Sequence, residues 1–301
     1  MATEPPSRTA LTGGLFALAA AVTWAAFPIY WRLLAGVPAT EVLLHRIVWS
    51  AVFAGLMLLP GGRWRHALAV AGQPRRLAVL AVTALLIGGN WLVFIWAVNA
   101  GRVLDASLGY FLNPLVNVAL GMLFLRERLT RGQAAGMVLA LLGVTALGLA
   151  QGVAPWVALA LALSFGFYGL LRKMAPIDPL VGMAIETWLL APPALAALLW
   201  LGGGGHFGTR DRATDLLLMA GGVVSTLPLV WFAAGAKRLR YTTMGFFQFI
   251  CPIGQFLLAV LAYGEPLTTT HLLTFGCIWA ALAVITAETV MRSRRPRTPP
   301  R

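Results

Sequence analysis

Ten apolar stretches divide this chain of 301 residues, and each has about the twenty residues that a helix needs to cross a bilayer. Because 59% of the residues are hydrophobic and 11% are charged, a soluble domain would lack the polar surface to cover itself, and a disordered chain is equally excluded. We therefore predict an all-α polytopic membrane protein with ten transmembrane helices and no room for a soluble catalytic domain. The predicted spans are residues 11–32, 41–59, 77–98, 104–125, 132–150, 155–171, 179–200, 215–236, 242–263 and 270–290.

The basic residues are distributed unequally between the two membrane sides that these spans define. Of the 23 Lys and Arg residues, 18 fall on the side of the N-terminus and 4 on the opposite side, while Arg46 falls inside the second span. Because short cytoplasmic loops carry an excess of positive charge, we expect both termini in the cytoplasm. Residues 1–10 then form a cytoplasmic tail and residues 291–301 a basic cytoplasmic tail. The net charge of +13 does not indicate a nucleic-acid partner, since the charges lie in short clusters between apolar runs.

The two halves of the chain resemble each other. A set of five residues near the end of the fourth span recurs 138 residues later near the end of the ninth: Pro114, Asn117, Glu127, Leu129 and Thr130 match Pro252, Gln255, Glu265, Leu267 and Thr268. We predict two five-helix repeats, residues 11–150 and 155–290. An odd number of spans gives the second copy the opposite orientation, and such a 5+5 inverted repeat is the architecture of many secondary transporters.

Three of the prolines and two of the charged residues within the predicted spans are candidates for a functional role. Pro114, Pro228 and Pro252 each remove a helix hydrogen bond, so we expect helix breaks that expose backbone polarity, although a kink for packing would also explain each one. Arg46 and Glu186 are costly at membrane depth and are candidate pathway residues. We expect Arg46 to anchor an anionic substrate group and Glu186 to bind a coupling proton or a substrate cation. The alternatives are a structural pair, or an Arg46 side chain that reaches to the interface.

Four segments carry a resemblance to a known family. They are Glu41–Trp49, Ile87–Asn99, Ala106–Asn117 and Gly245–Gln248. With its ten spans in two halves, the chain resembles the drug/metabolite transporter superfamily, whose EamA domain occurs twice, and within it the RarD subfamily. The resemblance implies a transporter of small organic compounds, an exporter in the bacterial inner membrane. It implies no catalytic motif, so we expect no enzymatic activity.

We expect the solute site near the midplane between the two halves. The candidate pathway residues are Arg46, Asn90, Trp91, Tyr110, Asn113, Glu186, Thr226 and Gln248. One half would rock against the other in alternating access, with the proton as candidate coupling ion. ATP is disfavoured as an energy source because the chain has two lysines and no phosphate-binding Gly-Lys-Ser/Thr loop.

Other functions and partners remain to be weighed. A non-transporting membrane scaffold or regulatory subunit is the alternative function. We expect membrane lipid as surroundings, no cofactor and no metal site, since the ten acids are scattered and the four histidines lie far apart. Cys251 and Cys277 are expected to be small packing residues. The oligomeric state is open.

Overall fold

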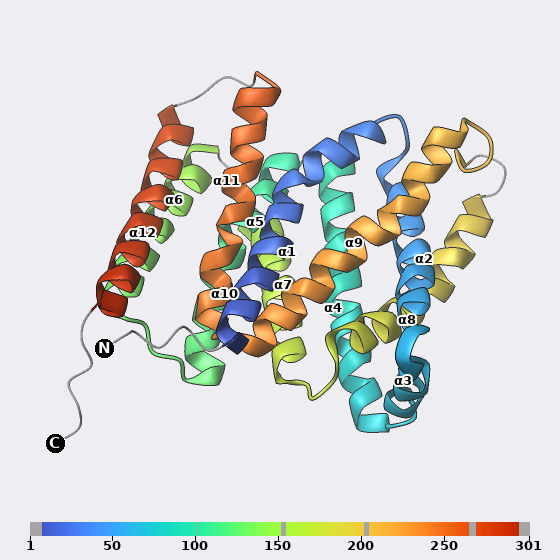
Figure 1. Ribbon diagram of the computed structural model, residues 1–301. Coiled ribbons are helices and arrows are strands. Elements are labelled where there is room, and N and C mark those ends of the chain that lie inside the picture. Colours follow the sequence, from blue (N-terminus) through green and yellow to red (C-terminus); the bar gives the residue numbers. More distant parts are fainter. Residues whose placement is uncertain (1–7, 101, 152–154, 202–204, 265–268, 295–301) are drawn as a thin grey trace.

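The computed structural model describes residues 8–100, 102–151, 155–201, 205–264 and 269–294, and every regular element in those ranges is helical (Figure 1). Two short elements, the 3₁₀ turn η1 (Pro60–Gly62) and the π turn η3 (Leu258–Ala262), join the longer ones. The α-helices are α1 (Arg8–Leu33), α2 (Ala39–Met57), α3 (Arg63–Ala71), α4 (Pro74–Asn99), α5 (Val103–Leu125), α6 (Arg131–Gln151), α7 (Pro155–Met174), α8 (Pro179–Leu201), α9 (Arg212–Arg238), α10 (Tyr241–Gln248), α11 (Ile250–Leu257) and α12 (Thr269–Arg294).

The helix count agrees with the ten predicted spans. Nine stretches of the described chain are long and apolar enough to cross a membrane, and α10, α11 and η3 together form one of them, Tyr241–Ala262. The tenth is α12, which contains the shorter apolar stretch Leu272–Glu288. The fold is thus an all-α, multi-pass membrane bundle. Its tail residues 1–7 and 295–301, and the repeat residues Glu265, Leu267 and Thr268, lie outside the described residues.

The second and third spans are joined by a helix that the sequence analysis assigned to a loop. Gly61 and Gly62 have φ angles of 72° and 69°, and this left-handed turn directs the chain into α3. Ala67 and Val70 bury one face of α3, while Trp64 stacks on Trp188 of α8 with ring centroids 4.7 Å apart. The rest of α3 is exposed and basic, which suits the membrane interface on the side where α1 begins.

Two of the three prolines that were expected to break a helix do not do so. Helix α5 continues through Pro114 and α9 continues through Pro228, because loss of one N–H leaves the flanking hydrogen bonds in place. A division occurs only near Pro252, where Phe249 separates α10 from α11. Pro28, which was not singled out, lies inside α1, and the Nε2 atom of Gln255 donates to the Trp24 carbonyl that this proline leaves without its helical donor (3.0 Å).

The packing pairs helices from the two halves in matching ways. Helices α6 and α12 lie together at one end of the bundle, and α2 and α8 pack together at the other (Figure 1). Between them, α1 packs on α9 as α4 packs on α7, and α5 packs on α7 as α11 packs on α1. Each of these contacts made by a helix of one half has a counterpart made by the matching helix of the other half. An inverted repeat would produce this arrangement. At the centre, α10 approaches α5 so closely that a Cβ on Gly245 would lie 2.7 Å from the Pro114 carbonyl oxygen.

Side chains at the helix ends fix the connections. Both carboxylate oxygens of Glu127 accept hydrogen bonds from the first turn of α10, from the N–H groups of Tyr241 (2.7 Å) and Thr242 (2.8 Å). Glu127 therefore caps the start of α10. Asp211 caps α9, and hydrogen bonds from the N–H and hydroxyl of Thr214 hold the pKa of this exposed carboxyl below its usual value.

Candidate functional site

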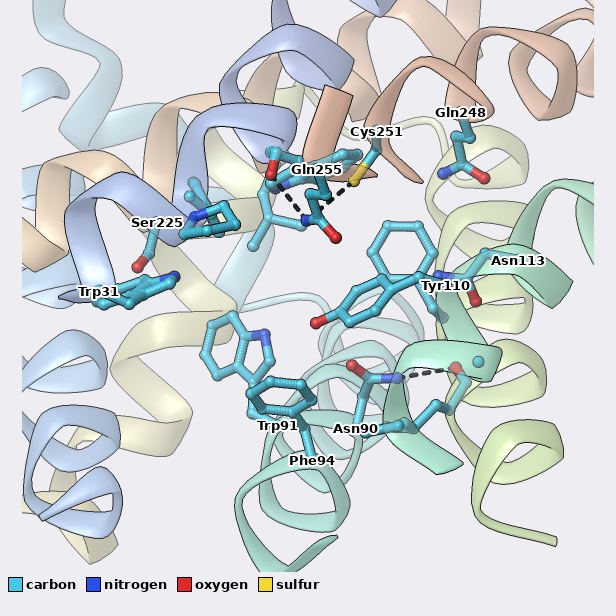
Figure 2. A pocket seen from close by; sticks show the side chains of 18 of the residues that line it. Trp31, Asn90, Trp91, Phe94, Tyr110, Asn113, Ser225, Gln248, Cys251 and Gln255 are labelled. Atoms are coloured by element: carbon cyan, nitrogen blue, oxygen red, sulfur yellow. Dashed lines mark hydrogen bonds between the residues drawn. The ribbon is translucent and has the colours of Figure 1, made fainter. Parts of the chain in front are cut away.

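A cavity of about 300 Å³ lies at the centre of the bundle (Figure 2). The residues of α1 and α4 that line the cavity lie in the C-terminal halves of these helices, and those of α5 lie in its N-terminal half. The cavity therefore lies nearer the membrane side opposite the start of α1. Seven aromatic residues contribute to the wall, together with several amide and hydroxyl groups. The lining residues are Trp24, Phe27, Pro28, Trp31, Arg46, Asn90, Trp91, Phe94, Ala106, Gly109, Tyr110, Asn113, Leu161, Phe165, Ser225, Leu229, Gln248, Cys251 and Gln255.

Arg46 brings a positive charge into this wall. Its guanidinium carbon lies 4.7 Å from the ring centroid of Trp31 and 4.9 Å from that of Trp91, so the two indoles flank it. Its Nε atom donates to the Ser225 hydroxyl at 2.9 Å. None of the salt bridges in the described part of the chain includes Arg46. The charge is therefore held in place by aromatic faces and one hydroxyl, without a carboxylate to neutralise it.

The amides of the cavity differ in how fully they are used. Asn90 donates from Nδ2 to the Leu161 carbonyl (2.8 Å) and to the Ser164 hydroxyl (2.9 Å), which fixes its side chain against α7. Gln248 accepts a hydrogen bond from Asn117. The Oδ1 atom of Asn113 is buried and has no hydrogen-bond partner among the described residues. Asn113 therefore presents an unused acceptor at the cavity wall.

Six of the eight predicted pathway residues line this cavity, and Glu186 and Thr226 do not. Thr226 is fully buried, and its neighbour Ser225 is the residue that faces the cavity. The predicted set was Arg46, Asn90, Trp91, Tyr110, Asn113, Glu186, Thr226 and Gln248. Thr226 was predicted and Ser225 was not, because one residue along a helix turns the side chain by 100° and the sequence does not show which of the two faces the cavity.

Glu186 lies instead in a buried ion pair on α8. Its Oε1 atom is 3.4 Å from Nε of Arg172 and accepts a hydrogen bond from the Thr83 hydroxyl at 2.5 Å. Both charged side chains are buried, at 0% and 1% exposure. Gly182 makes room for the arginine, since a Cβ there would lie 1.7 Å from Arg172 Nη1. This geometry favours a structural role for Glu186, as the partner of Arg172. The role of Glu186 in coupling stays a prediction.

The sequence analysis missed several cavity residues. Trp24 and Trp31 were not among the predicted pathway residues, and Cys251 was expected only to pack. A hydropathy pattern cannot distinguish a ring that faces lipid from one that faces a cavity, because both surroundings are apolar. Gln255 carried a usable signal, since it is the repeat partner of Asn117.

Hydrogen bonds close the bundle on the side where α1 begins. The Tyr241 hydroxyl lies within hydrogen-bond distance of two acceptors, Asn117 Oδ1 (2.9 Å) and the Gly166 carbonyl (2.7 Å), which share its one proton and bring α10, α5 and α7 together on that side of the cavity. Closer to that membrane surface, Lys173 donates to the Ala236 and Leu239 carbonyls at the end of α9.

The opposite side carries an acidic contact near α2. Glu41, in the first turn of α2, accepts from the His206 N–H (2.6 Å) and contacts His206 Nδ1 (2.9 Å). The His45 ring lies beside Phe207, with centroids 4.9 Å apart. Glu41 is therefore more than a local helix cap, because it holds the loop before α9 against the helix that carries Arg46.

Comparisons with known proteins agree with this architecture. The sequence pattern of the EamA-like transporter family matches residues 11–149. An uncharacterized transporter of Vibrio cholerae is 47% identical over 289 residues, with 94% of this chain and 95% of that protein covered. Protein RarD of Escherichia coli is 45% identical, with 94% and 96% covered. A crystal structure with 21% identity superimposes with a TM-score of 0.71, covers 94% of this chain and 99% of that one, and supports the fold.

Fold and cavity together define a multi-pass helical transporter of a bacterial inner membrane. The chain belongs to the RarD subfamily of the EamA-like transporter family. This confirms the resemblance that the four sequence segments indicated. A more distant relative in Pseudomonas aeruginosa, 35% identical over 274 residues, is named chloramphenicol-sensitive protein RarD.

Proposed function

We propose that the protein is a secondary transporter that exports small organic solutes from the cytoplasm by alternating access. The observation that carries the proposal is the central cavity, in which an unneutralised Arg46 faces an aromatic wall. A charge at this depth in a membrane is costly, and it is retained where a solute or ion uses it. The cavity volume of about 300 Å³ suits a small organic molecule.

Alternating access is supported by the position of the cavity, which lies nearer one membrane side. Hydrogen bonds tie the helices together on the side where α1 begins, whereas the cavity lies nearer the other side. With the termini in the cytoplasm, as the basic residues favour, this conformation is closed toward the cytoplasm. Movement of the paired helices would then close the outer side and open the inner one.

Proton coupling through Glu186 is the energy source that the charge pattern favours. Its ion pair with Arg172 would have to open when the carboxylate takes up a proton. Purified protein in vesicles, driven by an imposed pH gradient, tests this step. Gradient-driven flux by folded Glu186→Gln protein would contradict it.

The experiment for the proposed function measures flux without any added partner. Cells that express wild-type protein, Arg46→Gln protein or neither are compared for metabolites inside and outside the cell. We expect at least one compound to accumulate outside with the wild type alone, and vesicles containing only this chain to move it. Vesicles that move no compound enriched in this way would favour the scaffold or regulatory role.

A further inference from the structure

The charges and hydrogen-bonding groups of the cavity define the solute more narrowly than size does. We infer that the solute is an aromatic monoanion, such as a carboxylate, that also carries an uncharged hydrogen-bond donor. This inference rests on the proposed transport function and specifies its substrate class. It depends on three separate features of the wall in the described part of the chain: a cation without a carboxylate, amide oxygens without a donor, and facing aromatic rings.

The charge selects an anion. Arg46 lines the cavity, and none of the lining residues that the structure describes is acidic. An anionic group beside the guanidinium would offset the cost of the buried charge and would accept charge-assisted hydrogen bonds from it. A cation would be repelled, and the ammonium of a zwitterion would lose its water without gaining a carboxylate. Organic cations and zwitterions are therefore poorer ligands than an anion of the same shape.

The unused acceptor selects a donor. Among the described residues, Asn113 Oδ1 is buried without a hydrogen bond, and the side-chain oxygens of Asn90 and Gln255 also lack a donor. Gln248 Oε1, in contrast, already accepts from Asn117. A buried acceptor left without a partner costs free energy that a ligand hydroxyl or N–H would recover. The donor has to be neutral, because a second charge on the ligand would have no counter-charge in the wall.

The aromatic wall selects a flat apolar body. Trp31 and Trp91 flank Arg46, and Phe94 meets Tyr110 edge to face with centroids 5.9 Å apart. Figure 2 shows the rings of Trp91, Phe94 and Tyr110 around one open space, with Asn113 at its edge. A volume of about 300 Å³ is at the small end for ligand sites, which limits the body to about one ring system.

The test is a matched ligand series on the purified full chain in lipid nanodiscs, followed by calorimetry. The probes are 4-hydroxyphenylacetate, phenylacetate, 4-hydroxyphenylacetamide, tyramine and tyrosine. They share one ring and differ in charge or in the hydroxyl donor. We expect 4-hydroxyphenylacetate to bind tightest, phenylacetate several-fold weaker, and the neutral, cationic and zwitterionic probes about 10-fold weaker or more.

Variants connect the preference to particular groups. Arg46→Gln should abolish the preference for anions, and Arg46→Lys should keep the preference with lower affinity, because the charge remains but the flat stacking group is lost. Asn113→Leu should remove the advantage of the hydroxyl. Arg102→Gln is the matched control, since the Arg102 guanidinium also lies near two indoles, those of Trp96 and Trp156, but outside the cavity lining.

The wild-type series decides the inference even where a variant fails to fold. Equal binding of the amide, tighter binding of tyramine or tyrosine, or no saturable binding of any probe would each overturn it. Flux in vesicles separates a wrong substrate class from a wrong proposed function. Transport of cations or neutral solutes alone would leave the proposed function standing with the wrong substrate class, whereas a chain that moves no solute would overturn the function itself.

Discussion

Lys173 and Lys237, the two lysines of the chain, each bind the end of the other's helix. Lys173 at the end of α7 donates to carbonyls at the end of α9, and Lys237 at the end of α9 donates to the Ala175 (2.7 Å) and Ile177 carbonyls after α7. Each ammonium thus meets carbonyl groups at or just after the end of the other helix, where the helix dipole favours a positive charge. This reciprocal contact lies on the membrane side away from the cavity.

Removal of this contact should open the cavity toward that side. We expect Lys173→Met or Lys237→Met to increase several-fold the rate at which Cys251, a cavity residue, reacts with a membrane-impermeant maleimide. Reaction is measured in a Cys277→Ser background, with the reagent added to each membrane side in turn. Arg128→Gln, an exposed basic residue of the same side, is the control. Unchanged labelling in both lysine variants would show that the contact does not restrict access.

The buried pair of Arg172 and Glu186 should behave as a unit. Glu186→Gln leaves the arginine uncompensated, and we expect a loss of about 3–5 kcal/mol in the free energy of unfolding. A double variant, Arg172→Met with Glu186→Gln, should recover part of this loss because no isolated charge remains. Denaturation of all three proteins in one detergent measures the coupling. Additive losses in the double variant would mean that the two side chains do not stabilise each other.

A side-chain amide replaces the helix hydrogen bond that Pro28 removes. Gln255→Leu should destabilise the protein by about 1–3 kcal/mol, because the buried Trp24 carbonyl loses its donor. Adding Pro28→Ala to that variant should restore stability, since position 28 regains an N–H that can bond to Trp24 within α1. Thermal unfolding of the two single variants and the double variant tests this. No rescue in the double variant would contradict the proposed exchange of donors.

Helices α2 and α9 meet without space for one methyl group. A Cβ on Gly222 would lie 2.4 Å from the backbone carbon of Trp49, next to the 3.1 Å hydrogen bond from the Ser50 hydroxyl to Gly222 O. Gly222→Ala should therefore cost about 1–3 kcal/mol of stability and impair any transport that depends on the position of α2. Gly89→Ala is the control, because no atom lies within 4 Å of its Cβ. We expect that control to be neutral or stabilising, since alanine favours helix.

Sequence reasoning was most successful for features that depend only on the order of residues along the chain. The thickness of the bilayer sets the length of each span, so an apolar run of twenty residues predicts a helix almost regardless of its neighbours. The amphipathic α3 was missed because nine residues with several charges do not form such a run. The breaks predicted at Pro114 and Pro228 were wrong because proline removes only one bond of a helix that its neighbours support.

What the sequence determined by itself was the membrane class, the ten spans and the residues that are costly at depth. Which of those residues share a site was decided by tertiary structure alone. Arg46 and Glu186 look equivalent in the sequence, as single charges in matching spans, yet one lies in the cavity wall and the other is paired with Arg172. The physical reason is that lipid, protein core and cavity wall are equally apolar. Hydropathy therefore reports depth in the membrane, and only the packing of the helices determines what each side chain faces.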